Sequence, residues 1–218
     1  MKMVNLPVCD LRNIKTAEAA KSIEEIANCA LVIMPKEGDD DLLNALATIP
    51  QKNVASTVSL PASADVSLRN GVVTLTAAMM SSETETYYLV NGITVVEPIP
   101  ADKKATLVAN GVIVMHEKNR AESGLKLGAV NGITAYADFE HSVVQDGSFE
   151  IDADFLKYVK PKTLVIAGDS IEIADDVAVE NLAEKISFMI AGDSIVCPKA
   201  VSGYVRANST CGDGIEVK

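Results

Sequence analysis

Residues 163–173 read TLVIAGDSIEI, and residues 187–197 read SFMIAGDSIVC. The six letters IAGDSI therefore return unchanged after 24 residues, and a weaker copy, GDGIEV, occupies residues 212–217. Self-similarity at a period of about 20–50 residues is typical of proteins that repeat one supersecondary unit. We expect this part of the chain to be built from such a unit.

A second set of repeats begins with Asn-Gly. The copies read NGVVTL at 70–75, NGITVV at 91–96, NGVIVM at 110–115 and NGITAY at 131–136, so the spacings are 21, 19 and 21 residues. Short β-branched runs between turn-forming residues predict strands. One such strand cannot bury its apolar face alone, but copies stacked about 4.8 Å apart in a parallel ladder can. Asn and Gly supply the bends, and asparagines in register can form a hydrogen-bonded ladder.

These repeats predict a mainly β fold with short helices (α/β). The favoured architecture is a parallel β-solenoid or leucine-rich-repeat-like stack with rungs of about 20–24 residues. The alternative is an antiparallel hairpin sandwich, because Asn-Gly between apolar runs is also a strong hairpin signal. The near-constant period favours stacking, since a hairpin sandwich has no reason to keep one.

Short helices are expected between some strands. The apolar spacing predicts a helix over residues 16–27 with Thr16 as its cap. Acidic residues at helix starts predict three more helices, which begin after 39–41, after Asp152 and after 175–176. The helix after Asp152 is expected to end near Pro161. The chain is thus predicted to be a single repeat domain over 1–218, with helix-containing units at 1–52, strand-rich rungs at 53–145 and helix–strand rungs with Gly-Asp-Ser turns at 146–218.

The alternation of helix and strand resembles that of leucine-rich-repeat proteins, and the strand-rich middle resembles a parallel β-helix. The leucine-rich consensus L-x-x-L-x-L-x-x-N-x-L is matched nowhere, and the Gly-rich calcium nonapeptide is absent. The resemblance is to an architecture, so it carries over no family's site residues.

Composition limits the classes of partner. With 19 basic and 30 acidic residues the net charge is −11, which disfavours nucleic acid as a partner. No apolar run approaches the roughly 20 residues that span a bilayer. The first residues lack the apolar core of a signal peptide, and the four cysteines lie far apart. We therefore expect a soluble cytoplasmic protein with reduced thiols, no membrane contact and no cofactor.

The Gly-Asp-Ser turns are the most suggestive chemical motif. Residues 168–170, after an apolar run, resemble the nucleophile block of the Gly-Asp-Ser-Leu hydrolases, which makes Ser170 and Ser194 candidate nucleophiles with His141 or His116 as the base. In that family the block lies near the N-terminus and the histidine follows it. Here the block comes late and twice, and both histidines precede it. A recurring turn in which Asp and Ser bond the local backbone is the favoured interpretation.

The other motifs are incomplete. His116-Glu117 begins like H-E-x-x-H, but Arg120 occupies the position of the second zinc ligand, and no C-x-x-C pair is present. Glu140-His141 is an acid–base candidate or a solvated loop pair. No metal site is predicted.

The predicted function is a non-enzymatic repeat scaffold. Its partner would be another protein or a second copy, bound through the solenoid face or through the strand-like C-terminal edge at 215–218. The alternatives are a serine hydrolase that uses one Gly-Asp-Ser turn, and a small acidic sugar- or cation-binding module.

Overall fold

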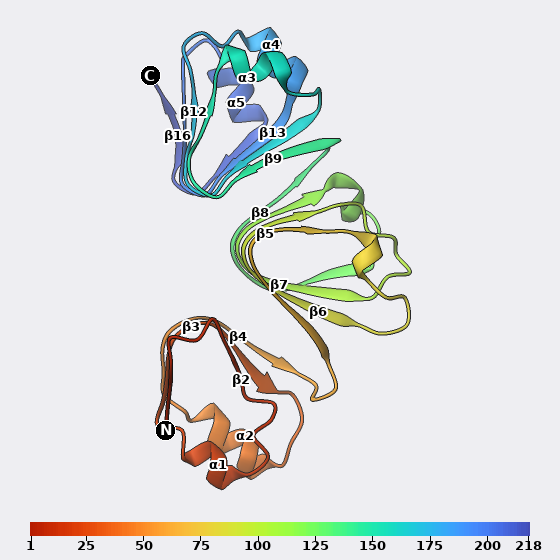
Figure 1. The fold of residues 1–218 in the computed structure, drawn as a ribbon, viewed down its shortest axis with the longest axis vertical. Helices are drawn as coiled ribbons and strands as arrows, with labels where there is room; N and C mark the ends of the chain where they lie inside the picture. Colours follow the sequence, from red (N-terminus) through yellow and green to blue (C-terminus); the bar gives the residue numbers. More distant parts are fainter.

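The computed structural model describes all 218 residues and is mainly β, with 49% strand and 18% helix. It holds four four-stranded sheets. Every strand pair is parallel, so the antiparallel hairpin sandwich is wrong. The Asn-Gly pairs lie at bends within long strands, where each strand pairs with the next repeat instead of folding back on itself (Figure 1).

The N-terminal stack contains three layers of strands. Strands β1 (Lys2–Val4) and β2 (Val8–Asp10) pair with two halves of β3 (Glu25–Pro35), and β4 (Gln51–Leu60) pairs with the other edge of β3. Helices α1 (Ala17–Lys21) and α2 (Asp40–Ala47) connect the layers and contact each other. Thr16 and Asp39 cap them through their side-chain oxygens.

The helix predicted over 16–27 is wrong beyond Lys21. Strand β3 begins at Glu25, and Ile26, inside the predicted helix range, is instead a fully buried strand residue between Met3 and Gln51 on the neighbouring strands. Hydrogen bonding to two neighbouring strands outweighs the weak helical preference of so short a segment.

The middle stack contains four long strands in the order β5 (Asp65–Leu75), β6 (Thr86–Val96), β7 (Ala105–His116) and β8 (Leu125–Ala137). Short 3-10 helices, η1 (Ala77–Met79) and η2 (Glu117–Arg120), follow β5 and β7. All four Asn-Gly pairs are in register across the sheet. The glycine of each pair has a positive φ, and the four strands bend together, so the sheet has two arms (Figure 1).

The C-terminal stack has two sheets joined at the Gly-Asp turns. One contains β9 (His141–Gln145), β11 (Thr163–Ala167), β13 (Ile186–Ala191) and β15 (Ser209–Cys211); the other contains β10 (Phe149–Ile151), β12 (Ile171–Ile173), β14 (Ser194–Cys197) and β16 (Gly214–Val217). Helices α3 (Ala153–Tyr158), α4 (Val179–Lys185) and α5 (Ser202–Ala207) link successive layers. The helix predicted after Asp152 is confirmed as α3, and the Asp152 side chain caps it. Helix α4 begins after Ala178, two residues later than 175–176, and α5 was not predicted.

The three stacks lie in a row and each encloses its own apolar core (Figure 1). Between them the outer faces of the sheets pack together: Leu31 and Ile33 contact the first arm of the middle sheet, and Leu164 and Ile190 contact its second arm. None of the α-helices has the length and hydropathy needed to cross a bilayer.

The last strands of all three stacks lie on the same side of the molecule. Strand β4 contacts β8, and Gly212 at the last Gly-Asp turn lies beside Ile133 of β8. The stacks therefore run in the same direction. We call the surface formed by the first strands (β1, β2, β5, β9 and β10) the leading face, and the surface formed by the last strands (β4, β8, β15 and β16) the trailing face.

The chain must return to the leading side before each new stack begins. At the first return, Arg12 after β2 holds the crossing segment 61–64: its guanidinium donates to the carbonyl oxygens of Pro61 (3.3 Å) and Ala64 (3.0 Å). At the second return, between β8 and β9, His116 at the end of β7 packs against Phe139 with ring centroids 5.1 Å apart. Each crossing is thus fixed by a side chain from an earlier layer.

Candidate functional site

The structure places Ser170 and Ser194 one above the other at the Gly-Asp turns. Their hydroxyl oxygens lie 3.2 Å apart, and both residues line a shallow hollow of about 340 Å³ over β10, β12 and β14. Each hydroxyl has the other as its side-chain partner, and neither histidine hydrogen-bonds to either serine. A nucleophilic serine needs a base within hydrogen-bond reach. The turns bring two hydroxyls together but bring no base to them.

The Gly-Asp-Ser segments have a clear role in the backbone of the stack. A Cβ built on Gly192 would lie 1.8 Å from the Gly168 carbonyl oxygen, so only glycine allows successive layers to approach here. The amide of Asp193 donates to the Asp169 carbonyl (2.9 Å), and that of Asp213 donates to the Asp193 carbonyl (2.8 Å). The repeated motif is explained by these contacts between layers.

The two histidines lie in separate places. His116 is buried at the seam between the middle and C-terminal stacks, where its Nδ1 accepts from the Lys118 amide (3.2 Å) and its Nε2 lies 3.5 Å from an Asp138 carboxylate oxygen. His141 begins β9 and pairs with Thr163, and its half-buried side chain makes no hydrogen bond.

Glu140, the candidate partner of His141, pairs with Lys162 instead. The Lys162 ammonium lies 2.7 Å from the Glu140 carboxylate. This hydrogen bond lowers the pKa of Glu140 and raises the pKa of Lys162. A carboxylate held ionised by an exposed lysine is suited to an ion pair and poorly suited to accept a proton near neutral pH.

The structure contains no group of three or more His, Cys, Asp or Glu side chains placed to hold a metal ion. Cys9, Cys29 and Cys197 are buried, and Cys211 is half-buried. Burial, with smaller contributions from Cys29 and Asp10, raises the pKa of Cys9 to about 11. Cys9 therefore stays a neutral thiol and packs as a small apolar side chain.

Two asparagine ladders run along the stacks. In the middle stack the amide of Asn110 donates to Asn91 (2.7 Å) and that of Asn131 donates to Asn110 (2.8 Å). In the N-terminal stack Asn28 donates to Asn5 (2.9 Å) and Asn53 to Asn28 (3.0 Å). The sequence analysis expected the first ladder from the Asn-Gly repeat. It missed the second, because there Asn alone adopts the positive φ at the bend, with no glycine after it.

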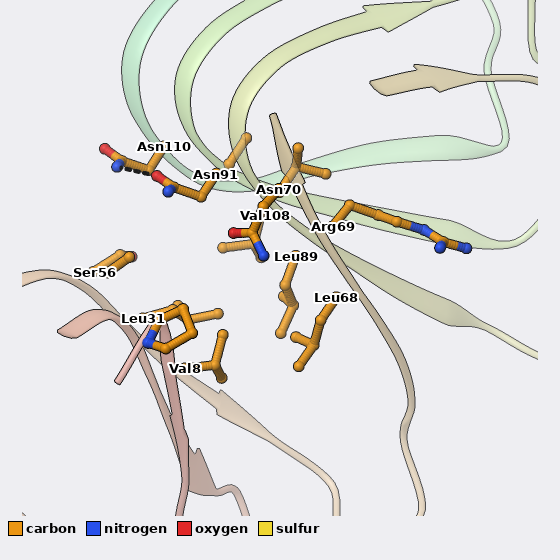
Figure 2. Close-up of a pocket in the computed structure, with 14 residues that line it drawn as sticks. Val8, Leu31, Ser56, Leu68, Arg69, Asn70, Leu89, Asn91, Val108 and Asn110 are labelled. Atoms are coloured by element: carbon orange, nitrogen blue, oxygen red, sulfur yellow. Dashed lines mark hydrogen bonds between the residues drawn. The ribbon is translucent and has the colours of Figure 1, made fainter. Parts of the chain in front are cut away.

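A narrow cleft with a cavity volume of only about 20 Å³ separates the N-terminal and middle stacks. Figure 2 shows Val8 and Leu31 on one wall and Leu68, Leu89 and Val108 on the other, with Asn91 and Asn110 at the rim. The walls are apolar and hold no titratable side chain except Arg69. The cleft is a packing seam between two sheets and offers no chemistry for a reaction.

The exposed apolar side chains gather at the ends of the stacks. All eight large apolar residues that are strongly exposed belong to a first or a last layer, and six of them belong to the first layers: Met1, Val4, Leu68, Val72, Met79 and Tyr158. The strands at both faces have a partner on one side only. Unpaired edges beside exposed apolar residues are the features that proteins use to add strands from a partner.

Comparison of the chain with protein-family models, with curated proteins and with solved structures finds no match.

Proposed function

We propose that the protein is a non-enzymatic scaffold, a β-solenoid in three side-by-side stacks, that acts by associating with further copies of itself through its strand edges. The observation that carries the proposal is the set of open edges on the leading and trailing faces. The helices lie within the layers, where α1 contacts α2 and α3 contacts α4. The end strands of a solenoid need either a cap or a partner strand.

The arrangement of the chemical groups supports a scaffold over a hydrolase. The two serines meet each other, the buried histidine fills a seam, and the remaining acid–base candidate is an exposed ion pair. The asparagine ladders and the glycine corners both make contacts between successive layers, as a stacked scaffold requires.

Static light scattering over a dilution series tests this function. The protein should have a mass of at least twice its chain mass of 23.0 kDa at micromolar concentration, and should dissociate on dilution. A mass of 23.0 kDa at every concentration would contradict self-association.

A further inference from the structure

We propose that the leading face is the interface of a two-fold symmetric dimer in which β5 pairs antiparallel with β5 of a second copy. This inference rests on the proposed function and specifies which face associates and with what symmetry. Strand β5 is the longest strand at the leading face, and only one of its edges has a partner.

The bend in β5 determines which kind of strand can pair along its whole length. The strand changes direction at Asn70-Gly71, so a straight strand can pair with only one of its arms. A second β5, inverted about the bend, turns through the same corner and can pair with both arms. A Cβ built on Gly71 would meet nothing within 4 Å, so the outer side of the corner is open to an approaching backbone.

The exposed side chains of β5 are complementary under this symmetry. Leu68 and Val72, each 47% exposed, lie two residues to either side of Asn70. When Asn70 is opposite its own copy, Leu68 of each chain is opposite Val72 of the other. Cross-strand apolar pairs of this kind are the unit of stabilisation in an antiparallel ladder.

The charges of the flanking stacks are also complementary. The same two-fold axis exchanges the two arms, so it places the N-terminal stack of one chain on the same side of the dimer as the C-terminal stack of the partner. Residues 1–22 hold four basic and two acidic side chains, whereas residues 141–160 hold two basic and four acidic. Opposite net charges on facing ends of the two stacks favour this orientation.

Head-to-tail continuation, the other way to pair β5, is blocked by Asp146. The middle and C-terminal stacks are both four layers deep, so extending one with a second copy extends the other. A Cβ on Gly168 would lie 2.1 Å from the Asp146 carbonyl oxygen, and the equivalent first-layer position is Asp146 itself, which has a Cβ. That Cβ would meet the Gly212 carbonyl of an added copy. The leading face therefore cannot pair with a parallel strand of a second copy stacked head-to-tail, but it can pair with an antiparallel strand.

Disulfide trapping tests the symmetry. Asn70→Cys and Asn131→Cys, each made with Cys211→Ser, place a thiol on the first and on the last strand of the row of in-register Asn-Gly pairs. A residue opposite its own copy in an antiparallel pair has a Cα separation that a disulfide can bridge. Mild oxidation should convert Asn70→Cys to a covalent dimer on a non-reducing gel and leave Asn131→Cys monomeric.

Each other outcome overturns the proposal in a distinct way. Cross-linking of Asn131→Cys alone would mean that the trailing faces associate, and cross-linking only in a mixture of the two variants would mean head-to-tail growth; both retain the scaffold function. No cross-link in any sample of a protein that is monomeric by light scattering would contradict both proposals.

Charge substitution supplies a second measurement that needs no new thiol. Leu68→Lys on β5 and Leu127→Lys on β8 change exposed apolar residues on the two edge strands of one sheet. Sedimentation equilibrium should show loss of the dimer for Leu68→Lys, and an unchanged dimer for Leu127→Lys. Retention of the dimer in Leu68→Lys with its loss in Leu127→Lys would contradict the assignment to the leading face.

Discussion

Single residues at the bends control how closely the layers approach. At Gly111, which has a φ of +130°, an added Cβ would lie 2.1 Å from the Gly92 carbonyl oxygen. Asn5, Asn28 and Asn53 adopt positive φ at the bends of the N-terminal stack, where asparagine is one of the few residues other than glycine that tolerates this conformation. The bends therefore use two solutions to the same backbone requirement.

A pair of alanine substitutions can separate two contributions to stability: the close approach of the layers and the positive φ at the bend. Gly111→Ala should cost about 3 kcal/mol or more, because it adds a clash with the next layer to the cost of a positive φ. Gly71→Ala, also at positive φ but facing open space, should cost about 1–2 kcal/mol. Urea denaturation of dilute samples measures both, and equal losses would mean that the layers are not in contact at this corner.

The sequence predicts these residues because each repeat copies them. The Asn-Gly register and the stacked Gly-Asp turns follow from identical letters at a constant spacing, and the structure confirms both. The φ of the isolated asparagines could not be predicted, since it depends on strands that lie 23 and 25 residues away.

At the scale of the elements, the crossing segment 61–64 is the clearest case of one strand end fixing another. The Arg12 guanidinium binds the Asp10 carboxylate through two nitrogens and donates to two carbonyls of the crossing. This contact could not be predicted from the sequence, because the partners lie about fifty residues apart and share no motif. Helix starts, by contrast, follow from local capping residues, as Thr16 and Asp152 demonstrate.

The Arg12–Asp10 ion pair should make the free energy of unfolding fall as the pH becomes acidic. Burial raises the pKa of Asp10, but the hydrogen bonds and the charge of Arg12 outweigh it and lower the pKa below its usual value. The stabilisation is therefore present above the unfolded-state pKa of about 3.9 and is lost as the pH falls through the lower folded-state pKa.

Arg12→Ala removes both the ion pair with Asp10 and the two hydrogen bonds to the crossing segment 61–64. The variant should unfold about 1.5–3 kcal/mol more easily at pH 7, the usual value of hydrogen bonds to a charged group. The difference from the wild-type protein should shrink below pH 4. Urea titrations at pH 7 and pH 3 check this, and a difference that does not change with pH would exclude Asp10 as the partner that matters.

At the scale of the whole molecule, the sequence predicts stacked parallel strands but not their division into three stacks. Strand β4 continues the N-terminal stack, and β5 starts a new stack beside it, although the sequence analysis placed both in the strand-rich segment 53–145. Whether a strand continues a stack or starts a new one depends on the crossing segment before it and on packing between the outer faces of the sheets. Both involve residues distant in the chain. The sequence located one open edge, the C-terminal run at 215–218 that contributes to β16 on the trailing face. The rest of the open faces follow from the division into three stacks, so the sequence could not locate them.

Packing between stacks gives a further prediction. Ile166 and Ile190 are fully buried, and they lie in the cluster that joins the C-terminal stack to the middle sheet. Ile166→Ala or Ile190→Ala should cost about 2–5 kcal/mol as large-to-small core changes. Ser170→Ala should cost less than about 1 kcal/mol, because its hydroxyl only meets that of Ser194. Chemical denaturation that gives the opposite order would mean that the sheet faces are inverted.

The central claim is that successive repeats lie side by side in register. Nuclear Overhauser contacts between backbone protons measure this most directly. The account predicts contacts from Asn91 to Asn110 and from Asn110 to Asn131, on neighbouring parallel strands. Contacts between Val90 and Ile93 and between Tyr88 and Val95, across a hairpin turn at Asn91-Gly92, would contradict it.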